Sequence, residues 1–444
     1  MSADTLLANG RILIGRELTE GCIAFKSGRI CYVGKEVFSP RASQRIDIDG
    51  NVILPGLVDA HVHLRDLGQT SKEDFLTGTR SAASGGFTTV LDMPYSIPPT
   101  DSPENLKQKM EAARSKTVVN VGLYGAFDPS LRHVKDLTRR GVVCFKVFTT
   151  RRQPFDGDDD SIIEKALLCA RQARIPVAFH AEDLKTIEGL ELKYKASGSY
   201  SPMVFAETHP PEAESIAVAR IVAIAEKTKA SIHFCHLSTE ESLRIVIAAK
   251  ARGLPVTCEV TPHHLLLSER EVSSQGGVAV VDPPLRMGRH QHALLDGLRH
   301  DIDSIASDHA PHTLQEKASE DPWSISPGFP GLETTLPVML TAVKHGILPL
   351  NRLIELLAAN PARIFGLSSK GSLSVGHDAD VTVVDLERRH TIDPSRFESK
   401  AKYSPFKGFE AIGQAVKVFV AGRTVMDDGD IIAEPGSGSI VLRL

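Results

Sequence analysis

Short apolar runs that alternate with helix-like stretches occupy the middle of this chain, and they constrain its fold more than any other feature. The runs span residues 52–59, 88–93, 118–124, 142–148, 176–180, 231–236, 255–260 and 304–307. Helix-like stretches lie at 103–113, 161–173, 212–227, 240–252 and 290–298, and two more follow at 332–345 and 350–358. This alternation predicts an α/β protein with a (β/α)8 TIM-type barrel. A doubly wound open sheet is the alternative, which the strand count alone does not exclude.

Both ends of the chain have a different character from the middle. The N-terminal part contains GRILIG, CIAFKSGRICYVG and QRIDIDGNVILPG, and the C-terminal part contains ADVTVVDLE and AVKVFVAGRTVMDDGDII. Alternating apolar residues with Gly-rich turns are typical of short β-strands. We therefore predict a small β-sandwich domain formed by residues 1–53 and 371–444, with the metal-dependent barrel in residues 54–370.

Composition and charge exclude several classes of protein. The 444 residues are enough for a barrel and a small second domain. A formal net charge of -4 gives no electrostatic argument for nucleic acid or an anionic membrane as a partner. We find no signal peptide and no apolar run long enough to cross a bilayer. The six cysteines are scattered without a CxxC pair, which indicates reduced core residues and a cytoplasmic protein.

Nitrogen and oxygen donors lie at the ends of several of the predicted strands, or within them. In a (β/α)8 barrel the carboxyl ends of the strands share one face, so these residues would meet there. Such donors are those that a catalytic zinc-type site needs. The six candidate ligands are His61, His63, Lys146, His180, His236 and Asp308. Because six donors exceed a single zinc site, we expect two ions.

The histidines have ordinary alternatives when each is taken alone. His61 and His63 point to one side of their strand because side chains alternate, but a pair of loop histidines would give the same pattern. His180 and His236 each end an apolar run, where a buried core histidine is the more common case. Cys235 and Glu259 lie nearby in sequence or strand order; Cys235 should point away from the face that His236 uses, and we expect little part for either residue in metal binding.

Lys146 and Asp308 are the two ligands with a chemical role beyond coordination. Lys146 lies in VVCFKVF, where burial of an ammonium is costly, so its amine should be neutral or paired. A neutral amine can add carbon dioxide to give an anionic carbamate that bridges two metal ions; a side chain that reaches solvent is the alternative. Asp308 can bind an ion and move protons, although it could also be a loop carboxylate or a helix cap. Together the six residues predict a metal-dependent hydrolase.

Longer motifs surround these residues. They include GLVDAHVHLRDLGQTSKEDFLTGT, GGFTTVLDMP, FKVF, FHAED, HFCHLST, GLPVTCEVTPHHLLLSE, ASDHAPHTLQEK and SPGFPGLETTLP. In these motifs the chain resembles the amidohydrolase superfamily and, within it, the dihydroorotase family. HVHLR, TPHHL and SDHAPH are specific in combination. The resemblance is closest to the dihydroorotase domain of the animal multifunctional pyrimidine enzyme and extends into SKAKYSPFKGFEAIGQAVKVFVAGRTV.

The resemblance implies an activity and a set of roles. Dihydroorotases catalyse the reversible, zinc-dependent cyclisation of N-carbamoyl-L-aspartate to L-dihydroorotate in pyrimidine biosynthesis. By similarity, one zinc ion would be held by His61, His63, Lys146 and Asp308, and the other by His180, His236 and the N6-carboxylated Lys146. A hydroxide bridging the two ions would attack the ring amide, and Asp308 would serve as general acid and base.

Five further residues are implied in substrate binding. Arg65 and His312 would bind the substrate carboxylate; their alternatives are a surface cation and a partner that orients Asp308. The stretch that begins at Pro327 would present backbone groups to the ring, or else form a tight turn. Tyr95 stands where many relatives have Asn. Asp282 stands where bacterial relatives often have Asn, and it would face a dianionic substrate unfavourably unless it is turned away or paired.

Two other classes of function stay open. The first is another cyclic amidase, an allantoinase or a hydantoinase/dihydropyrimidinase, and the sequence MPYSIPPT is similar to allantoinases. The second is a non-catalytic scaffold, although this chain keeps all six ligands. Residues 149–160 could form a lid or a solvated loop. We expect a small-molecule substrate and a homodimer, and we leave association with aspartate transcarbamoylase open.

Overall fold

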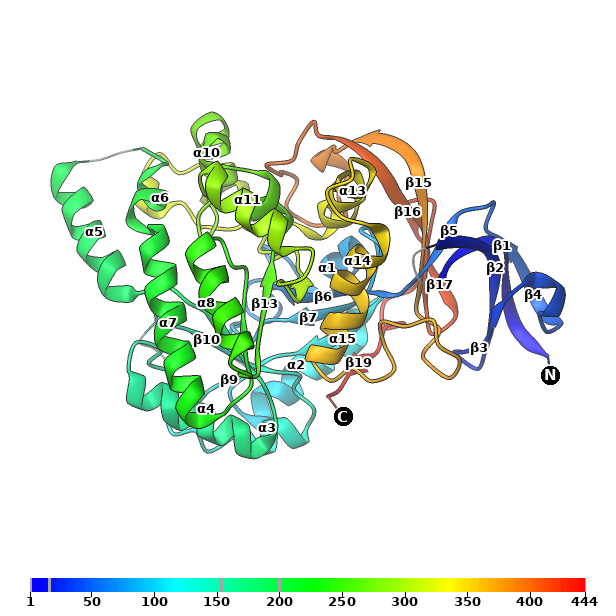
Figure 1. Cartoon of the computed structure of the whole chain (residues 1–444), viewed down its shortest axis with the longest axis horizontal. Coiled ribbons are helices and arrows are strands. Elements are labelled where there is room, and N and C mark those ends of the chain that lie inside the picture. The colour runs from blue at the N-terminus through cyan, green and yellow to red at the C-terminus, as the bar shows by residue number, and fades with distance from the viewer. Residues whose placement is uncertain (1, 15–16, 152–154, 199–200, 444) are drawn as a thin grey trace.

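A ring of parallel strands surrounded by helices forms the larger part of the computed structural model, which describes residues 2–14, 17–151, 155–198 and 201–443 (Figure 1). The strands in order are β6 (Leu57–Val62), β7 (Phe87–Asp92), β8 (Asn120–Leu123), β9 (Gly125–Ala126), β10 (Phe145–Phe148), β11 (Val177–His180), β12 (Ile232–Phe234), β13 (Val256–Val260) and β14 (Ser304–Ile305). They pair in the runs β6–β7–β8 and β9–β10–β11–β12–β13–β14. Only Tyr124 separates β8 from β9, so these two are pieces of one strand.

Contacts between the first and eighth strands bring the two ends of the ring together. Val62 forms a parallel bridge with His309, and the backbone N–H of His63 donates to the carbonyl of His309 at 2.8 Å. The Asp59 carboxylate accepts the backbone N–H of Ser307. In an open doubly wound sheet the edge strands lie apart. The (β/α)8 barrel predicted from the sequence is therefore confirmed.

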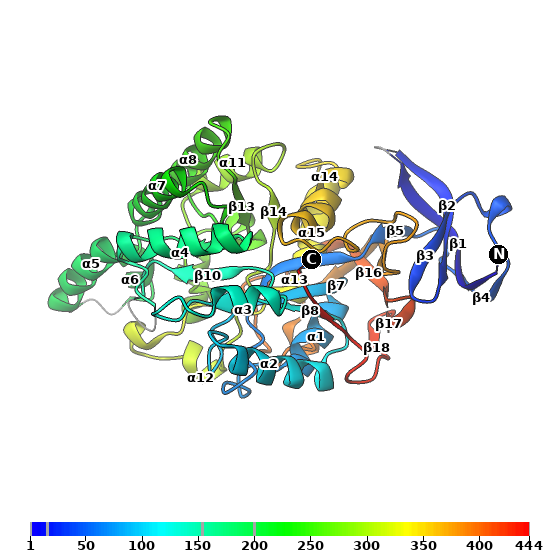
Figure 2. The same cartoon turned by 90° about the horizontal axis from the view of Figure 1, so that it is seen from below.

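The helices cover the outside of the ring (Figures 1 and 2). They are α1 (Phe75–Ser84), α2 (Pro103–Lys116), α3 (Val134–Arg139), α4 (Asp160–Ala173), α5 (Leu184–Ser197), α6 (Val204–Thr208), α7 (Pro211–Thr228), α8 (Glu240–Ala251), α9 (Pro262–Leu266), α10 (Glu269–Gln275), α11 (Gly288–Gly297), α12 (Leu314–Lys317), α13 (Leu332–Lys344), α14 (Leu350–Ile354) and α15 (Asn360–Ile364). In α4, Ile163, Ala166, Leu167 and Ala170 are buried, which is the spacing of one helix face. Its first turn is capped by the Asp159 carboxylate, which accepts the N–H of Ser161 and Ile162.

The terminal segments combine in one nine-stranded sheet. Its members are β1 (Ala3–Ile14), β2 (Glu17–Lys26), β3 (Arg29–Gly34), β4 (Ala42–Asp47), β5 (Val52–Pro55), β15 (Val381–Thr391), β16 (Glu410–Val420), β17 (Arg423–Asp427) and β18 (Asp430–Ile431). The order is β18-β17-β16-β15-β5-β1-β2-β3, with β4 paired to β1. The antiparallel pair β5–β15 joins the two ends of the chain. The domain limits at 53/54 and 370/371 stay a prediction.

The sheet folds back over its own core. Phe25 in β2 and Phe419 in β16 have ring centroids 6.0 Å apart, although β15, β5 and β1 separate their strands in the sheet. Both rings belong to a buried apolar cluster that also contains Leu7, Ile23 and Val381. This arrangement agrees with the sandwich expected from both termini, and Figure 2 shows β1–β4 at the end of the molecule farthest from α5.

The last strand does not belong to this sheet. β19 (Ile440–Val441) pairs in parallel with β8 of the barrel. A Cβ atom at Gly122 in β8 would lie 2.6 Å from Leu91, 3.0 Å from Val143 and 3.2 Å from Val441, so the absence of a side chain there lets all three residues pack against β8. The predicted C-terminal segment 371–444 therefore contributes to the barrel as well as to the terminal sheet. No helix in the described part of the chain is both long and apolar enough to cross a lipid bilayer.

Candidate active site

A cavity of about 170 Å³ opens at the carboxyl ends of the barrel strands. Nine of the predicted site residues line it: His61, His63, Arg65, His180, His236, Asp282, Asp308, His312 and Pro327. The other two lie outside the lining. Lys146 is fully buried, with its Nζ 5.0 Å from the ring centroid of the cavity residue Phe148. Tyr95 packs edge-on against Phe148, and its hydroxyl donates to the backbone carbonyl of Lys146 at 3.0 Å.

The first group of candidate ligands converges on Asp308. Nε2 of His61 lies 3.3 Å from Oδ1 of Asp308, and Nε2 of His63 lies 3.5 Å from the same oxygen. These three atoms are close enough together to share one metal ion. They come from the end of β6 and from the segment after β14, which the closed ring makes neighbours.

The second group consists of His180 and His236. Nδ1 of His180 lies 3.2 Å from Nε2 of His236, so the two nitrogens face each other. Nε2 of His180 is occupied by Glu182 at 2.9 Å, which leaves Nδ1 directed toward His236. Two imidazole nitrogens that converge in this way suit a second metal ion.

Lys146 lies next to Cys235. Its Nζ is 2.9 Å from the Cys235 Sγ, and both side chains are buried. The sequence-based expectation that Cys235 points away from the face used by His236 is therefore wrong. The reason is the backbone of His236, whose φ of +33° breaks the alternation of side chains directly after β12. Cys235 and His236 consequently both face the interior of the site.

Three cavity residues have a left-handed backbone. The φ angles are +60° at Arg65, +33° at His236 and +46° at Asp308. Side chains other than glycine rarely adopt this conformation, and each instance costs on the order of 1–3 kcal/mol. Such strain concentrates at functional sites, where the surrounding fold holds a side chain in a required direction.

Two buried carboxylates lie behind the histidines, and their role as hydrogen-bond partners was not predicted from the sequence. Glu259 in β13 bridges Nδ1 of His61 at 2.5 Å and Nε2 of His233 at 3.1 Å. Burial opposes ionisation of Glu259, but the two imidazoles hold its pKa well below the usual range. Asp59 accepts the backbone N–H groups of His61 and Ser307, and burial raises its pKa to about 7. An acidic residue inside an otherwise apolar strand is the signal that could have found both.

The imidazoles are held in their neutral form. Burial, assisted by Lys146, lowers the pKa of His61 to about 4, and burial also lowers the pKa of His180 to about 4. The pKa values of His63 and His236 also lie well below the usual range, again chiefly because of burial. Metal ions bind the neutral imidazole, so these side chains are prepared for coordination. Burial raises the pKa of Asp308 well above its usual range, which is the direction that suits a proton carrier.

Arg65 and His312 lie together on another wall of the cavity. Nη2 of Arg65 is 3.1 Å from Nε2 of His312, and Nε of Arg65 donates to the carbonyl of Pro311 at 3.3 Å. The Tyr403 hydroxyl lies 3.1 Å from both the backbone N and the carbonyl oxygen of His312 and so fixes this segment. A guanidinium beside an imidazole is suited to bind a carboxylate.

Asp282 is near the second group of ligands. Its Oδ1 lies 3.6 Å from Nε2 of His180 and has no hydrogen-bond partner in the described chain. Burial, together with the neighbouring Glu182, raises the pKa of Asp282 to about 6, although His180 opposes this. The carboxyl group is therefore available to a ligand, and it is neither turned away nor fully paired.

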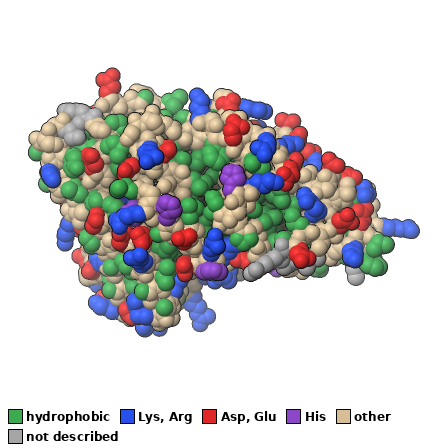
Figure 3. Space-filling model, turned by 45° about the horizontal axis from the view of Figure 1, so that its top comes forward, with side chains coloured by type: hydrophobic (Ala, Val, Ile, Leu, Met, Phe, Trp, Pro, Cys, Tyr) green, Lys and Arg blue, Asp and Glu red, His purple; other side chains and the backbone are tan. Residues whose placement is uncertain are grey.

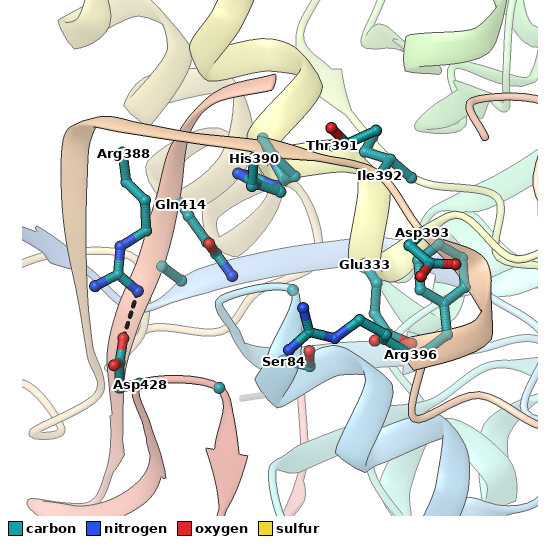
Figure 4. Close-up of a pocket in the computed structure, with 15 residues that line it drawn as sticks. Ser84, Glu333, Arg388, His390, Thr391, Ile392, Asp393, Arg396, Gln414 and Asp428 are labelled. Atoms are coloured by element: carbon teal, nitrogen blue, oxygen red, sulfur yellow. Dashed lines mark hydrogen bonds and ion pairs between the residues drawn. The ribbon is translucent and has the colours of Figure 1, made fainter. Parts of the chain in front are cut away.

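A larger cavity, of about 390 Å³, lies elsewhere, against α1, α13, β15 and β16 (Figure 4). It contains an Arg388–Asp428 ion pair, and His390 and Arg396 also line it. None of the predicted site residues lines this cavity.

On the face of the molecule shown in Figure 3, positive and negative side chains are interspersed.

Comparisons with known proteins agree with this geometry. The model of the amidohydrolase family matches residues 52–425. The chain is 39% identical to the dihydroorotase of Methanothermobacter thermautotrophicus over 441 residues, which cover 98% of this chain and 96% of that protein. It is 38% identical to the dihydroorotase of Geobacter sp. over 414 residues, covering 92% and 95%. The chain therefore belongs to the amidohydrolase family and, within it, to the dihydroorotases.

Solved structures of related enzymes share the whole fold. An L-hydantoinase (dihydropyrimidinase) from Arthrobacter aurescens has a TM-score of 0.96 and 31% identity, covering 99% of this chain and 100% of that one. A dihydropyrimidinase from Brevibacillus agri has a TM-score of 0.93 and 26% identity, covering 99% and 98%. The relatives cited here are archaeal and bacterial, so the closer likeness to the animal domain stays a prediction. The predicted lid, 149–160, includes residues 152–154, which lie outside the described part of the chain.

Proposed function

We propose that this protein is a zinc-dependent dihydroorotase, which interconverts N-carbamoyl-L-aspartate and L-dihydroorotate. The observation that carries the proposal is one cavity whose lining combines two groups of candidate metal ligands with a paired arginine and histidine. The full-length similarity to dihydroorotases supports the same assignment.

The residues fit a pair of metal ions. His61, His63 and Asp308 would hold one ion, and His180 and His236 the other, with the carboxylated amine of Lys146 shared between them. Burial lowers the pKa of all four imidazoles, which favours the neutral form that metal ions bind. When bound, the ions would lower the pKa of water and polarise the amide carbonyl.

Asp308 would move the proton. In hydrolysis, water adds to the ring amide carbonyl, the C–N bond breaks, and Asp308 carries a proton from the water to the departing nitrogen. In ring closure the ureido nitrogen attacks the side-chain carboxyl group, and protonated Asp308 assists the loss of water. The Asp308 carboxylate lies within 3.5 Å of both His61 and His63, a position from which it would reach a carbonyl group bound at these residues.

Arg65, His312 and Asp282 would orient the substrate. Arg65 and His312 would bind the free carboxylate, because both present N–H donors to the cavity. Asp282 would accept an N–H of the ring or of the ureido group, since its Oδ1 has no other hydrogen bond. Pro327 and Gly328 would border the ring, and Tyr95 would act indirectly, through Phe148 and the Lys146 carbonyl.

A side-by-side assay tests the assignment. The zinc-loaded protein is given dihydroorotate, carbamoyl aspartate, allantoin and hydantoin under the same conditions. We expect turnover of dihydroorotate and carbamoyl aspartate, with much lower activity on the two substrates that lack a carboxylate. Turnover of allantoin or hydantoin alone would reject the proposal.

A hydantoinase is the second candidate. The fold match to the hydantoinase from Arthrobacter aurescens, with its TM-score of 0.96, favours it, as does Asp282 in a site for an anionic substrate. Arg65 beside His312 argues against it, because hydantoin carries no carboxylate that needs two donors.

We also propose a cytoplasmic homodimer, and light scattering of the purified protein tests its size. Association with aspartate transcarbamoylase is tested by co-sedimentation of the two enzymes.

A further inference from the structure

We propose that Lys72 is a positioning residue: it fixes the proton of His312 on Nε2 and so keeps a carboxylate site open between His312 and Arg65. This inference rests on the proposed function and deepens it, because it says how the site selects a carboxylated ring. Lys72 does not line the cavity and precedes α1.

The imidazole of His312 lies between two cations. Nζ of Lys72 is 3.2 Å from Nδ1, and Nη2 of Arg65 is 3.1 Å from Nε2. Lys72 is held in place by Glu316, whose Oε1 is 2.6 Å from Nζ. Burial opposes ionisation of Glu316, but the Lys72 hydrogen bond and two bonds from Thr313 lower its pKa to about 2. Glu316 is thus an ionised anchor for the lysine.

Hydrogen-bond chemistry determines which nitrogen of His312 carries the proton. An ammonium has only donors, so Nδ1 of His312 must accept from Lys72. Burial, together with Arg65 and Lys72, lowers the pKa of His312 to about 3, so the ring is neutral and has one proton. That proton must lie on Nε2, which is the nitrogen that faces Arg65.

Two donors then face each other across 3.1 Å. The Nε2–H of His312 and the Nη2–H of Arg65 cannot satisfy one another, because a guanidinium has no acceptor. A carboxylate oxygen placed at this position would accept from both groups. The two donors therefore need an acceptor oxygen between them, and the charge of the guanidinium favours an anionic one such as a carboxylate.

Without Lys72, the imidazole of His312 would form a hydrogen bond with Arg65 and so occupy the carboxylate site itself. Oε2 of Glu316 lies 3.8 Å from Nδ1 of His312, near enough to become its acceptor after a small movement. The proton would then move to Nδ1, and Nε2 would accept the N–H of Arg65. The substrate carboxylate would have to break that Arg65–His312 hydrogen bond before it could bind.

The tautomer can be measured without activity. In protein labelled with ¹⁵N-histidine, the His312 resonances are assigned by their loss in His312→Asn. We expect an unprotonated Nδ1 in the wild type and a protonated Nδ1 in Lys72→Met. A protonated Nδ1 in the wild type, or identical His312 spectra in the two proteins, would overturn the proposal.

Kinetics give the second readout. In Lys72→Met we expect KM for dihydroorotate to rise on the order of tenfold to a hundredfold, the cost of one lost charged hydrogen bond, while kcat changes little. The inhibition constant of orotate should rise equally and that of uracil, which lacks the carboxylate, should not. Lys72→Arg should restore most of the affinity. A fall in kcat at constant KM, or equal losses for orotate and uracil, would contradict a carboxylate-positioning role.

A matched control separates the loss of substrate affinity in Lys72→Met from the general effect of losing an ion pair. Lys400 pairs with Asp74 at the same 2.6 Å as Lys72 with Glu316, but it contacts no cavity residue in the described chain. Lys400→Met should leave all kinetic constants unchanged. If the wild type fails to turn over dihydroorotate, the proposed function fails, and the tautomer measurement still decides the role of Lys72.

Discussion

His61 and His180 use their two ring nitrogens in the same way. Each gives one nitrogen to a buried glutamate, Glu259 at 2.5 Å and Glu182 at 2.9 Å, and turns the other toward the site. A carboxylate behind a histidine fixes its tautomer and raises its basicity as a ligand. The glutamates therefore select which nitrogen is offered to a metal ion.

Asp308 carries the clearest prediction for a single residue. Asp308→Asn keeps the shape of the side chain but cannot move a proton, so kcat should fall by roughly a hundredfold to ten-thousandfold. The melting temperature should stay close to that of the wild type. Steady-state rates in both reaction directions measure the effect, and Asp296→Ala at an exposed position of α11 is the control. Wild-type rates in Asp308→Asn would remove this residue from the mechanism.

The sequence predicted which candidate ligands lie together better than it predicted their surroundings. His61, His63, His180, His236 and Asp308 could be found because polar residues at the ends of apolar strands converge in a barrel. The direction of Cys235 could not, because it depends on the positive φ of His236. Lys72 was not singled out either, because its role depends on the position of His312, far away in the sequence.

At the scale of elements, α12 ties together two loops of the cavity. Lys317 at its end is buried, and its Nζ donates to the carbonyls of Val280 at 2.8 Å and Ser326 at 2.9 Å. These carbonyls lie just before the segments that carry Asp282 and Pro327. A single side chain therefore holds both segments at the mouth of the site.

Lys317 should make stability depend on pH. Burial lowers its pKa in the folded protein from 10.5 to about 7. Between these values the unfolded chain binds the proton and the folded chain does not, so by linkage the free energy of unfolding rises with pH. Denaturant titrations from pH 7 to 10 should show this rise in the wild type and a smaller one in Lys317→Met. If the free energy of unfolding rose equally with pH in the two proteins, Lys317 would not be the source of the pH dependence.

Strands and helices were predicted correctly where the local sequence shows a clear apolar run or a helical spacing of apolar residues. The runs at 142–148 and 176–180 contain β10 and β11, and 161–173 matches α4 closely. The stretch predicted as a helix at 350–358 covers α14 and most of a π-helical turn at Glu355–Ala359, and α15 follows beyond the predicted end. Pro361 has no N–H to continue a regular α-helical hydrogen-bond ladder, and the π-helical turn lies directly before it. α5 and α6 also went unpredicted, because no apolar strand separates them from α7.

At the scale of the whole molecule, the two chain ends connect the barrel to the terminal sheet. β5 and β15 pair beside the first barrel strand, and β19 returns to pair with β8. The union of both termini in one sheet was predictable from composition, but the return of β19 was not. β19 pairs with β8 through only two residues, which are too few to give a recognisable strand pattern in the sequence.

Removal of β19 should weaken the barrel. Deletion of residues 438–444 loses the bond from the Val121 N–H to the Ser439 carbonyl and exposes the surface that Val441 covers. The free energy of unfolding should fall on the order of 2 kcal/mol or more. Urea denaturation measures this, with deletion of residues 1–2 as the control. Equal stability of the two truncated proteins would show that β19 contributes nothing.

The most direct test is a crystal structure with data collected at the zinc absorption edge, after incubation with zinc and bicarbonate. The account predicts two anomalous peaks per chain, one between His61, His63 and Asp308 and one beside His180 and His236. Additional density on Nζ of Lys146 should reach both peaks. A single peak or none, together with an unmodified Lys146, would contradict the central claim.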